Sequence, residues 1–422
     1  MDIAVIGVSC QMPKAANTAQ YWQNLIDGEL CTCEVESSRW PFRIDPEISP
    51  LLQYGALLDR AFDFDNEFFN INTKEARQMD PQQRLLLKHT WLAFEDAGIK
   101  PSSLAGQDVG VYVGVMGNEW GSLLLPQLNA LETYSVTGNG YCMIPNRVSY
   151  FFDFRGPSIA LDTACSSSLV AIEQACRGLK DGRTKVAVAA GVNLILSPVN
   201  HVFYHRTSLA AKDGRCKPFS SDADGIVRGE GVGVVILKTL EQAKRDGDYI
   251  YAVIKGARVA HNGRSNGIVS PSRSAQYELL SKVYDESQVQ AHALNYVECH
   301  GTGTLIGDPI ELKALGEFLR HHHMQASLPI GSVKANIGHL EGAAGVASFI
   351  KACLMLSNQQ VPPSINYSAP NPYIDFEGYK LQIVTKTQPL QKDPITGKST
   401  IGISSFGLGG TICHAILQSA PH

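Results

Sequence analysis

The chain has 422 residues, of which 44% are hydrophobic and 18% are charged, so it can bury a large core and shows no compositional sign of disorder. Its formal net charge of −4 gives no general electrostatic footprint for nucleic acid or for an anionic membrane. No uninterrupted apolar stretch approaches the roughly 20 residues that a spanning helix needs, so we expect neither a nucleic-acid nor a membrane partner.

The short β-rich runs of this chain alternate with amphipathic segments, which predicts an α/β protein with buried sheets. The predicted strands are 3–8, 109–115, 158–161, 186–192, 232–237, 252–254, 294–297, 330–333 and 415–417. The predicted helices are 21–26, 81–97, the segment after residue 165, 275–283, 309–320 and 345–356. The last of these is almost wholly apolar or small, so we expect it to be buried on most sides.

Residues 162–168, Asp-Thr-Ala-Cys-Ser-Ser-Ser, place Cys165 between a predicted strand and a predicted helix. A thiol at a helix N-terminus faces unpaired backbone N–H groups and the positive end of the helix dipole, which favours the thiolate. The same N–H groups can hold an oxyanion. The competing interpretation is a small buried hydrophobic residue, which describes most free cysteines.

Two later segments, 298–304 and 334–342, carry His300 and His339 in glycine-rich backbone, each after a strand-like run. A lone histidine in such a place is more often structural than catalytic. One cysteine and two histidines, all predicted at strand ends, favour a reaction centre.

The ordered motifs of the chain resemble those of β-ketoacyl synthase domains of the polyketide synthase type, in the thiolase-like superfamily of condensing enzymes. The resemblance runs nearly end to end. It is carried by residues 3–7, 79–84, 162–168, 213–217, 228–231, 298–304, 334–342 and 405–411.

This resemblance implies a thiolase-like α/β fold, a duplicated five-layer α/β/α/β/α arrangement with two similar halves around the site. We assign residues 1–255 to the N-terminal half, which carries Cys165, and residues 256–422 to the C-terminal half, which carries both histidines. Together the halves form one ketosynthase domain.

The resemblance also implies the reaction, a decarboxylative Claisen condensation in polyketide biosynthesis. Cys165 would take the acyl chain from a carrier protein. His300 and His339 would lie over the thioester carbonyl of a malonyl-type extender and donate hydrogen bonds to its enolate as neutral imidazoles, because two imidazolium ions would be costly in a desolvated pocket.

Five further polar residues match functional positions of the family. Lys334 corresponds to the active-site lysine that supplies positive potential. Asp308 and Glu311 correspond to an acidic pair that organises the His300 loop, although acidic groups at a helix start are also ordinary caps. Thr302 and Thr304 correspond to hydroxyls that bind the phosphopantetheine arm, although turn residues of this kind often bond their own backbone.

The remaining family positions concern the oxyanion hole and the acyl pocket. The backbone N–H groups of Cys165 and Leu408 would form the hole, and Met143, Phe406 and Leu408 would line the pocket. Leu408 replaces the phenylalanine gate of fatty acid synthases, which favours the polyketide type. Ile412 replaces the usual asparagine of the loop and removes one hydrogen-bonding side chain.

Two alternatives stay open. A non-elongating ketosynthase would only transfer acyl groups between carriers; loss of the histidine at the His300 position is a common sign of that type, and this histidine is present. A non-catalytic chain-length-factor-like partner would lack the nucleophile, and Cys165 is present.

The expected partners are an acyl carrier protein, other polyketide synthase domains and a second copy of the chain in a homodimer, in which Met143 would line the shared pocket. We expect no bound cofactor, because substrates would arrive on the phosphopantetheine of the carrier.

The chain opens on the first expected strand and stops at residues 418–422, where the family's core ends, so we expect a domain excised from a larger synthase. We expect a cytoplasmic location with the 10 cysteines reduced, since no charged leader precedes that strand. No metal site is predicted. Cys31 and Cys33 have the wrong spacing for a zinc ribbon, and the histidines 321–323 are interpreted as a solvated loop.

Overall fold

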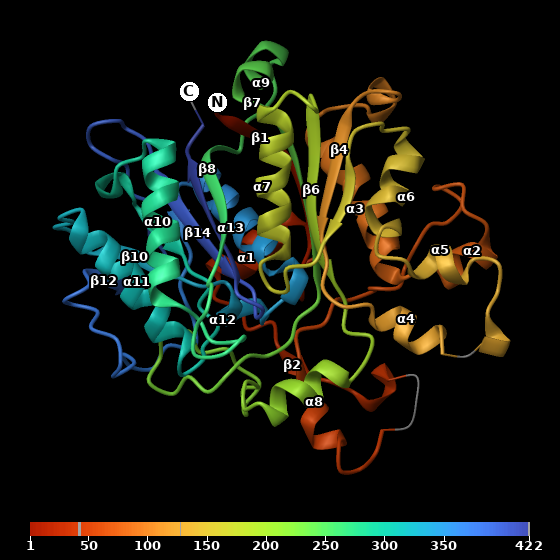
Figure 1. Cartoon of the computed structure of the whole chain (residues 1–422), viewed down its shortest axis with the longest axis horizontal. Coiled ribbons are helices and arrows are strands. Elements are labelled where there is room, and N and C mark those ends of the chain that lie inside the picture. The colour runs from red at the N-terminus through yellow and green to blue at the C-terminus, as the bar shows by residue number, and fades with distance from the viewer. Residues whose placement is uncertain (41–43, 127, 421–422) are drawn as a thin grey trace.

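The fold is built on one long sheet (Figure 1). The computed structural model describes residues 1–40, 44–126 and 128–420, so Pro421 and His422 lie outside the described residues. Eleven strands of this part of the chain form the sheet, in the order β12-β10-β9-β14-β15-β8-β1-β7-β6-β4-β5.

The strands of the sheet belong to two consecutive groups along the chain. The first group is β1 (Ile3–Gln11), β4 (Val109–Gly114), β5 (Ser158–Leu161), β6 (Val186–Asn193) and β7 (Gly231–Thr239). The second group is β8 (Ala252–His261), β9 (Tyr296–Glu298), β10 (Leu328–Gly331), β12 (Leu381–Ile383), β14 (Thr400–Phe406) and β15 (Thr411–Gln418). Two small sheets pair β2 (Cys33–Glu34) with β3 (Tyr54–Gly55) and β11 (Gln360–Val361) with β13 (Gln388–Pro389).

The two groups repeat one topology. In the first group, β5, β4 and β6 run parallel to one another. β7 pairs antiparallel with β6, and β1 pairs antiparallel with β7. In the second group, β10, β9 and β14 run parallel to one another. β15 pairs antiparallel with β14, and β8 pairs antiparallel with β15. The halves meet where β1 pairs with β8. The predicted boundary at residues 255 and 256 falls inside β8 and stays a prediction.

The helices cover both faces of this sheet and fill the space between its halves. They are α1 (Thr18–Ile26), α2 (Thr73–Gln78), α3 (Pro81–Asp96), α4 (Glu119–Leu124), α5 (Ser135–Asn139), α6 (Met143–Phe152), α7 (Ser167–Lys180), α8 (Val199–Arg206), α9 (Leu240–Asp246), α10 (Arg273–Ser287), α11 (Gly307–His321), α12 (Lys334–Ile337) and α13 (Ala344–Asn358).

Three hydrophobic cores define five layers. The middle core holds α7 and α13, which contact each other and strands of both halves. A second core packs α3 and α6 on the outer face of the first half, and a third packs α10 and α11 on the outer face of the second. Side chains of β1 alternate accordingly, since Ile3 and Val5 enter the middle core while Ala4 and Ile6 enter the outer one. The predicted five-layer α/β/α/β/α arrangement is confirmed.

Helix α13 shows why a hydrophobic helix belongs in the middle layer. All of its residues from Ala344 to Leu356 are buried, as its composition predicts. Its one cation, Lys351, is neutralised by Glu298 of β9, with 2.6 Å between Nζ and Oε2.

Candidate active site

Cys165 lies in a strained turn between β5 and α7, as predicted. The preceding residue, Ala164, has a φ of 56°, in the left-handed region that costs a non-glycine residue free energy. The turn is held from both sides, because the Oγ of Ser167 accepts from the Thr163 N–H at 2.9 Å and the Oγ of Ser405 donates to the Cys165 carbonyl oxygen at 2.9 Å.

The glycine-rich loop after β14 closes over this turn. A Cβ on Gly407 would lie 2.2 Å from the Thr163 carbonyl oxygen, so only glycine permits the approach. The close contact brings the backbone N–H groups of Leu408 and of Cys165 itself near enough to the thiol to lower its pKa. These are the two groups predicted to form the oxyanion hole.

Burial outweighs the backbone N–H groups that, as expected, favour the thiolate of Cys165. Burial raises the pKa of Cys165 to about 12, and the charge of Glu341 acts in the same direction. Lys334 and the two backbone donors lower this pKa but do not offset the loss of water. Cys165 therefore rests as a thiol and must lose its proton as it reacts.

The two predicted histidines face the same cavity from neighbouring loops. His300 follows β9 and His339 follows α12, and their ring centroids are 5.7 Å apart with an interplanar angle of 82°. Burial and the charge of Lys334 hold the pKa of each imidazole well below its usual range. Both rings are therefore neutral near pH 7.

The backbone fixes which ring nitrogen of each histidine carries the proton. The N–H of Phe406 donates to Nδ1 of His300 at 3.2 Å, and the N–H of Glu341 donates to Nδ1 of His339 at 3.0 Å. Because each Nδ1 accepts a hydrogen bond, the proton of each neutral ring is on Nε2. Each histidine therefore has one N–H donor free for a ligand.

A buried lysine and two carboxylates support the His300 loop. Nζ of Lys334 donates to the His300 carbonyl oxygen at 2.6 Å. Glu311 accepts from the N–H groups of His300 and Gly301 at 2.7 and 2.8 Å, and Asp308 accepts from Gly303 at 3.1 Å. Burial raises the pKa of Asp308 to about 6 and that of Glu311 to about 7. Burial lowers the pKa of Lys334.

The cavity above the cysteine has a volume of about 450 Å³ and brings most of the predicted residues together. Its lining includes Cys165, His300, His339, Thr302, Thr304, Glu311, Phe406 and Leu408. The hydroxyl oxygens of Thr302 and Thr304 lie 3.0 Å apart on its wall. Met143 does not line this cavity. It begins α6 and is partly buried, so its assignment to a shared pocket stays a prediction.

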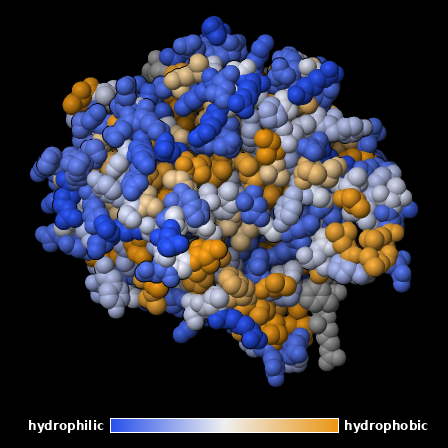
Figure 2. Space-filling view, in the orientation of Figure 1, coloured by the Kyte–Doolittle hydropathy of each residue, from blue (hydrophilic) through white to orange (hydrophobic). Residues whose placement is uncertain are grey.

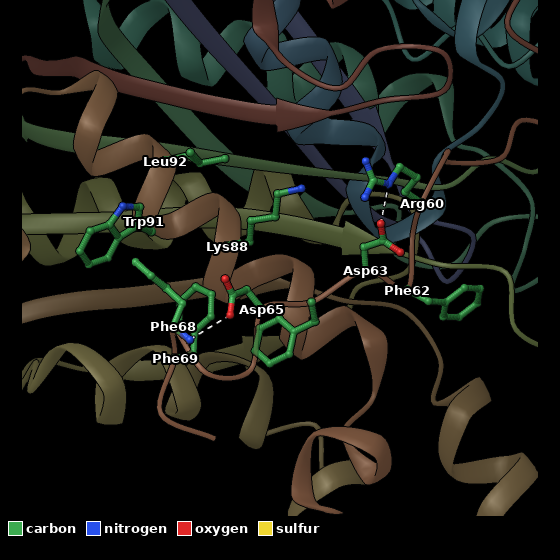
Figure 3. A pocket seen from close by; sticks show the side chains of 10 residues that line it. Arg60, Phe62, Asp63, Asp65, Phe68, Phe69, Lys88, Trp91 and Leu92 are labelled. Carbon is green, nitrogen blue, oxygen red and sulfur yellow. Dashed lines mark hydrogen bonds and ion pairs between the residues drawn. The ribbon is translucent and has the colours of Figure 1, made fainter. Parts of the chain in front are cut away.

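A second hollow of about 730 Å³ lies elsewhere, between residues 60–69 and the C-terminal half of α3 (Figure 3). Aromatic side chains such as Phe68 and Trp91 line it together with the ion pair of Arg60 and Asp63. None of the predicted catalytic residues lines it.

Several residues of the site were not predicted. Ser405 lies in residues 405–411, one of the segments that carry the family resemblance, so the sequence does indicate that it is near the site. Arg228 lies in another such motif, but nothing local shows that its guanidinium reaches Glu341 and Glu119. Gln276 lines the cavity, yet its sequence position indicates only a helix.

The described part of the chain shows no cluster of three or more histidine, cysteine, aspartate or glutamate side chains placed to hold a metal ion. The histidine run begins at His321, the last residue of α11, so it lies only partly in a loop. No helix of the described residues is long and apolar enough to cross a membrane.

Comparisons with known proteins agree with this geometry. The family model for the beta-ketoacyl synthase N-terminal domain matches residues 1–243, that for its C-terminal domain matches residues 251–368, and the ketoacyl-synthetase C-terminal extension matches residues 370–422.

Among curated proteins, the chain is 43% identical to a phenolphthiocerol/phthiocerol polyketide synthase of Mycobacterium bovis, over 99% of this chain and 22% of that protein. It is 41% identical to probable polyketide synthase 1 of Dictyostelium discoideum, over 99% of this chain and 14% of that protein. The chain thus spans about a fifth or less of the length of these two relatives.

Among solved structures, the ketosynthase from module 6 of the bacillaene synthase of Bacillus subtilis matches with a TM-score of 0.94 and 36% identity, over 100% of this chain and 72% of that one. A Streptomyces albus oxazolomycin ketosynthase domain matches with a TM-score of 0.94 and 37% identity, over 100% of this chain and 76% of that one. The predicted thiolase-like fold is confirmed by these neighbours.

Proposed function

Because this chain belongs to the β-ketoacyl synthase family, as a ketosynthase domain of the polyketide synthase type, we propose that it extends an acyl chain held on Cys165 by a decarboxylative Claisen condensation. The observation that carries this proposal is the pair of neutral histidines, each with Nε2–H free, facing one cavity with a cysteine that has two backbone donors. Such a site holds the acyl thioester on the cysteine and stabilises an enolate beside the two histidines.

In the loading step, the sulfur of Cys165 attacks the thioester carbonyl of an acyl carrier protein. The new S–C bond forms while the N–H groups of Cys165 and Leu408 stabilise the oxyanion. The intermediate then collapses, the bond to the phosphopantetheine sulfur breaks, and the thiol proton of Cys165 ends on that leaving sulfur. The thiol loses its proton in the same step in which the sulfur attacks, because the pKa of this thiol is raised to about 12.

In the condensation step, a malonyl-type extender loses carbon dioxide. The electrons of the C–C bond to the carboxylate move into an enolate, whose oxygen accepts hydrogen bonds from Nε2–H of His300 and His339. The enolate carbon attacks the acyl carbonyl on Cys165, a C–C bond forms, and the S–C bond breaks. The released thiolate then takes up a proton, which restores the resting thiol.

Lys334 supports this step without contacting the enolate. Its positive charge lowers the pKa of both histidines, which keeps them neutral as hydrogen-bond donors. Its hydrogen bond to the His300 carbonyl fixes the loop on which that donor lies.

The substrates arrive on phosphopantetheine, which we propose to lie along Thr302 and Thr304. Their hydroxyls line the cavity and can exchange their mutual hydrogen bond for one to an amide of the arm. The protein itself needs no bound cofactor for this chemistry. A reducing cytoplasm suits its cysteines, all ten of which are free thiols.

We also propose a homodimer that forms at the edge of the sheet. β5 is the last strand in the sheet order, and Ile159 on it is 41% exposed, while Tyr150 of the neighbouring α6 is 88% exposed. Figure 2 shows several hydrophobic patches, across the middle and toward the lower right and bottom, on one mainly hydrophilic face of the molecule. An exposed, partly apolar edge strand invites pairing with a second copy. Sedimentation that finds a stable monomer with full condensing activity would reject the dimer.

The function is tested with two carrier proteins, one acylated and one malonylated. Mass spectrometry should find one acyl group on Cys165, followed by a β-ketoacyl product and release of carbon dioxide. Cys165→Ser is the control that cannot form the thioester. Acylation of Cys216 or Cys299 with Cys165 free would reject the nucleophile. Acyl transfer to the second carrier without loss of carbon dioxide would replace the proposal with a non-elongating transferase.

A further inference from the structure

Glu341 has a strained backbone beside a catalytic histidine. Its φ is 46°, in the left-handed region that glycine adopts freely and other residues avoid. Its N–H is the group that donates to Nδ1 of His339 at 3.0 Å. The donor that sets the tautomer of His339 therefore comes from a residue whose conformation needs outside support.

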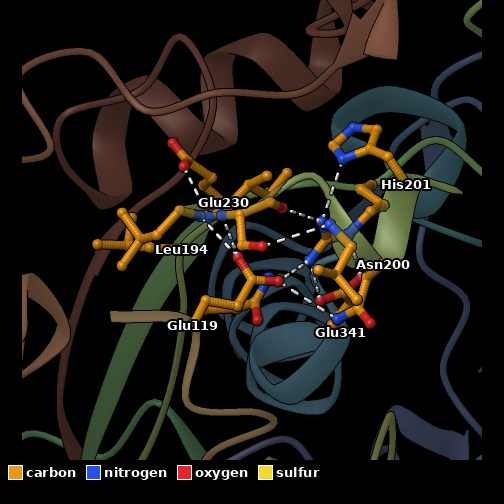
Figure 4. Close-up of polar contacts among 12 residues, drawn as sticks. Glu119, Leu194, Asn200, His201, Glu230 and Glu341 are labelled. Atoms are coloured by element: carbon orange, nitrogen blue, oxygen red, sulfur yellow. Dashed lines mark hydrogen bonds and ion pairs between the residues drawn. The ribbon is translucent and has the colours of Figure 1, made fainter. Parts of the chain in front are cut away.

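That support comes from a buried arginine (Figure 4). Nε of Arg228 donates to Oε1 of Glu341 at 2.6 Å, and its second nitrogen donates to Oε2 at 3.0 Å. The side chains are 2% and 1% exposed, so water does not weaken the pair. A two-pronged pair of this kind fixes the direction of the carboxylate as well as its distance.

Arg228 is in turn held rigidly by other elements. Its guanidinium also donates to Oε1 of Glu119 in α4 at 2.8 Å and approaches Nδ1 of His201 in α8 at 3.1 Å. The backbone beside it pairs directly with His339, whose N–H donates to Val227 at 2.7 Å. The arginine thus connects the histidine loop to two fixed helices.

We propose that Arg228 is a positioning residue for condensation, which holds Glu341 in the left-handed conformation so that its N–H keeps His339 in the Nε2–H tautomer. The inference rests on the proposed function, since that tautomer is the one that donates to the enolate. Without the ion pair, Glu341 relaxes toward ordinary backbone angles, Nδ1 of His339 loses its donor, and the ring populates both tautomers.

A matched pair of substitutions separates backbone positioning from loss of charge. Glu341→Ala and Glu341→Gly both remove the carboxylate and leave Arg228 with Glu119, but only glycine adopts the left-handed conformation without strain. We expect the glycine variant to condense about tenfold faster than the alanine variant, and both to acylate Cys165 at similar rates. Equal condensation by the two variants would overturn the proposal.

The tautomer itself gives a readout that does not depend on activity. In protein labelled with ¹⁵N-histidine, NMR should show an unprotonated Nδ1 for His339, with the signal assigned by its loss in His339→Ala. Glu341→Ala should show averaging between the two tautomers, and Glu341→Gly should stay close to the native spectrum. A native tautomer in Glu341→Ala would reject the role of Arg228, whereas absence of condensation by the unmodified chain would reject only the proposed function.

The role of Arg228 is tested by two variants whose side chains are similar in length to that of arginine. Arg228→Met removes the charge, and Arg228→Lys keeps it but cannot make the two-pronged contact. We expect condensation to fall in both, with at most partial rescue by lysine, while circular dichroism reports whether each variant folds. Full condensing activity in a folded Arg228→Met variant would contradict the proposal.

Discussion

Nζ of Lys334 lies 2.6 Å from the carbonyl oxygen of His300, so the buried cation holds the backbone of this proposed catalytic histidine rather than its ring. The same charge lowers the pKa of His300 and of His339. One side chain therefore influences both the position and the protonation state of the hydrogen-bond donors.

Lys334→Met should shift the pH dependence of extender decarboxylation. Burial, the larger cause of the lowered pKa of both histidines, remains in this variant, but removing the positive charge of Lys334 raises that pKa part of the way toward the ordinary value, so the rings become protonated at a higher pH than in the native protein. The acid limb of the rate profile should move to higher pH, and the rate on the plateau should fall because the loop loses its anchor. The measurement is carbon dioxide release across pH 5 to 9 (roughly the range around the ordinary histidine pKa). An unchanged acid limb would contradict the electrostatic role.

His300→Ala and His339→Ala should separate loading from condensation. The oxyanion donors for loading are backbone groups, which these substitutions leave in place. Each variant should still form acyl-Cys165, while β-ketoacyl product should fall by about 10²–10³-fold, the usual cost of losing one donor to a developing oxyanion. Variants that load poorly but condense normally once loaded would show that the roles are wrong.

The raised pKa of Cys165 predicts how its reactivity varies with pH. Since the reactive form is the thiolate and the pKa is raised to about 12, alkylation of Cys165 by iodoacetamide should increase steadily between pH 7 and 10 (about tenfold per unit below the pKa). Peptide mapping distinguishes this thiol from the other cysteines. Glu341→Gln should increase alkylation at each pH, because the negative charge that raises the pKa is gone. A plateau near neutral pH would instead support the thiolate that the helix position alone indicates.

Leu408→Phe should narrow the range of acyl groups without damaging the chemistry. The backbone donor of residue 408 is unchanged by the substitution, but an aromatic ring must swing aside to admit a chain. Loading of bulky or α-branched acyl groups should slow, while short linear groups are spared. The comparison is the loading rate of Cys165 for both sets of acyl groups in the two proteins. An equal loss for every acyl group would indicate a damaged oxyanion loop.

Gln276→Leu should stabilise the folded protein and lower its rate of condensation. The side chain is 2% exposed, and neither Nε2 nor Oε1 has a hydrogen-bond partner among the described residues. Replacing it with leucine should raise the free energy of unfolding by about 1 kcal/mol, since an unpaired buried amide costs roughly 1–3 kcal/mol. Condensation should slow, because the amide lines the cavity and is available to a polar group of the substrate. Denaturant unfolding measures the first effect, with exposed Gln290→Leu as the control, and a loss of stability would show that the amide is satisfied.

The sequence brings Cys165 and His300 to attention because each closely follows a strand, whereas His339 follows the short helix α12 and not the strand end that the sequence predicts. The carboxyl ends of β5 and β9 carry Cys165 and His300, and parallel strands of a repeated sheet bring such ends to one place. The resemblance adds the distant partner Leu408, whose N–H no local pattern would assign to the thiol.

The properties that the sequence does not predict all depend on burial by distant segments. The helix N-terminus at Cys165 is visible in the sequence, but the burial that dominates its pKa is not, and the charge of Glu341 and the N–H of Leu408, which also act on this pKa, come from distant segments of the chain. The left-handed backbone of Glu341 is equally invisible, because a glutamate carries no glycine-like signal and its compensating ion pair reaches Arg228 across 113 residues.

The two donors proposed for the oxyanion hole come from different halves of the repeat, with the N–H of Cys165 from the first and that of Leu408 from the second. A single half contains only one of these donors and either the nucleophile or the histidines. Both donors can therefore act on one anion only while the two halves stay joined, and they are joined at the antiparallel pairing of β1 with β8. A shift of one half along this seam would therefore move one donor relative to the other.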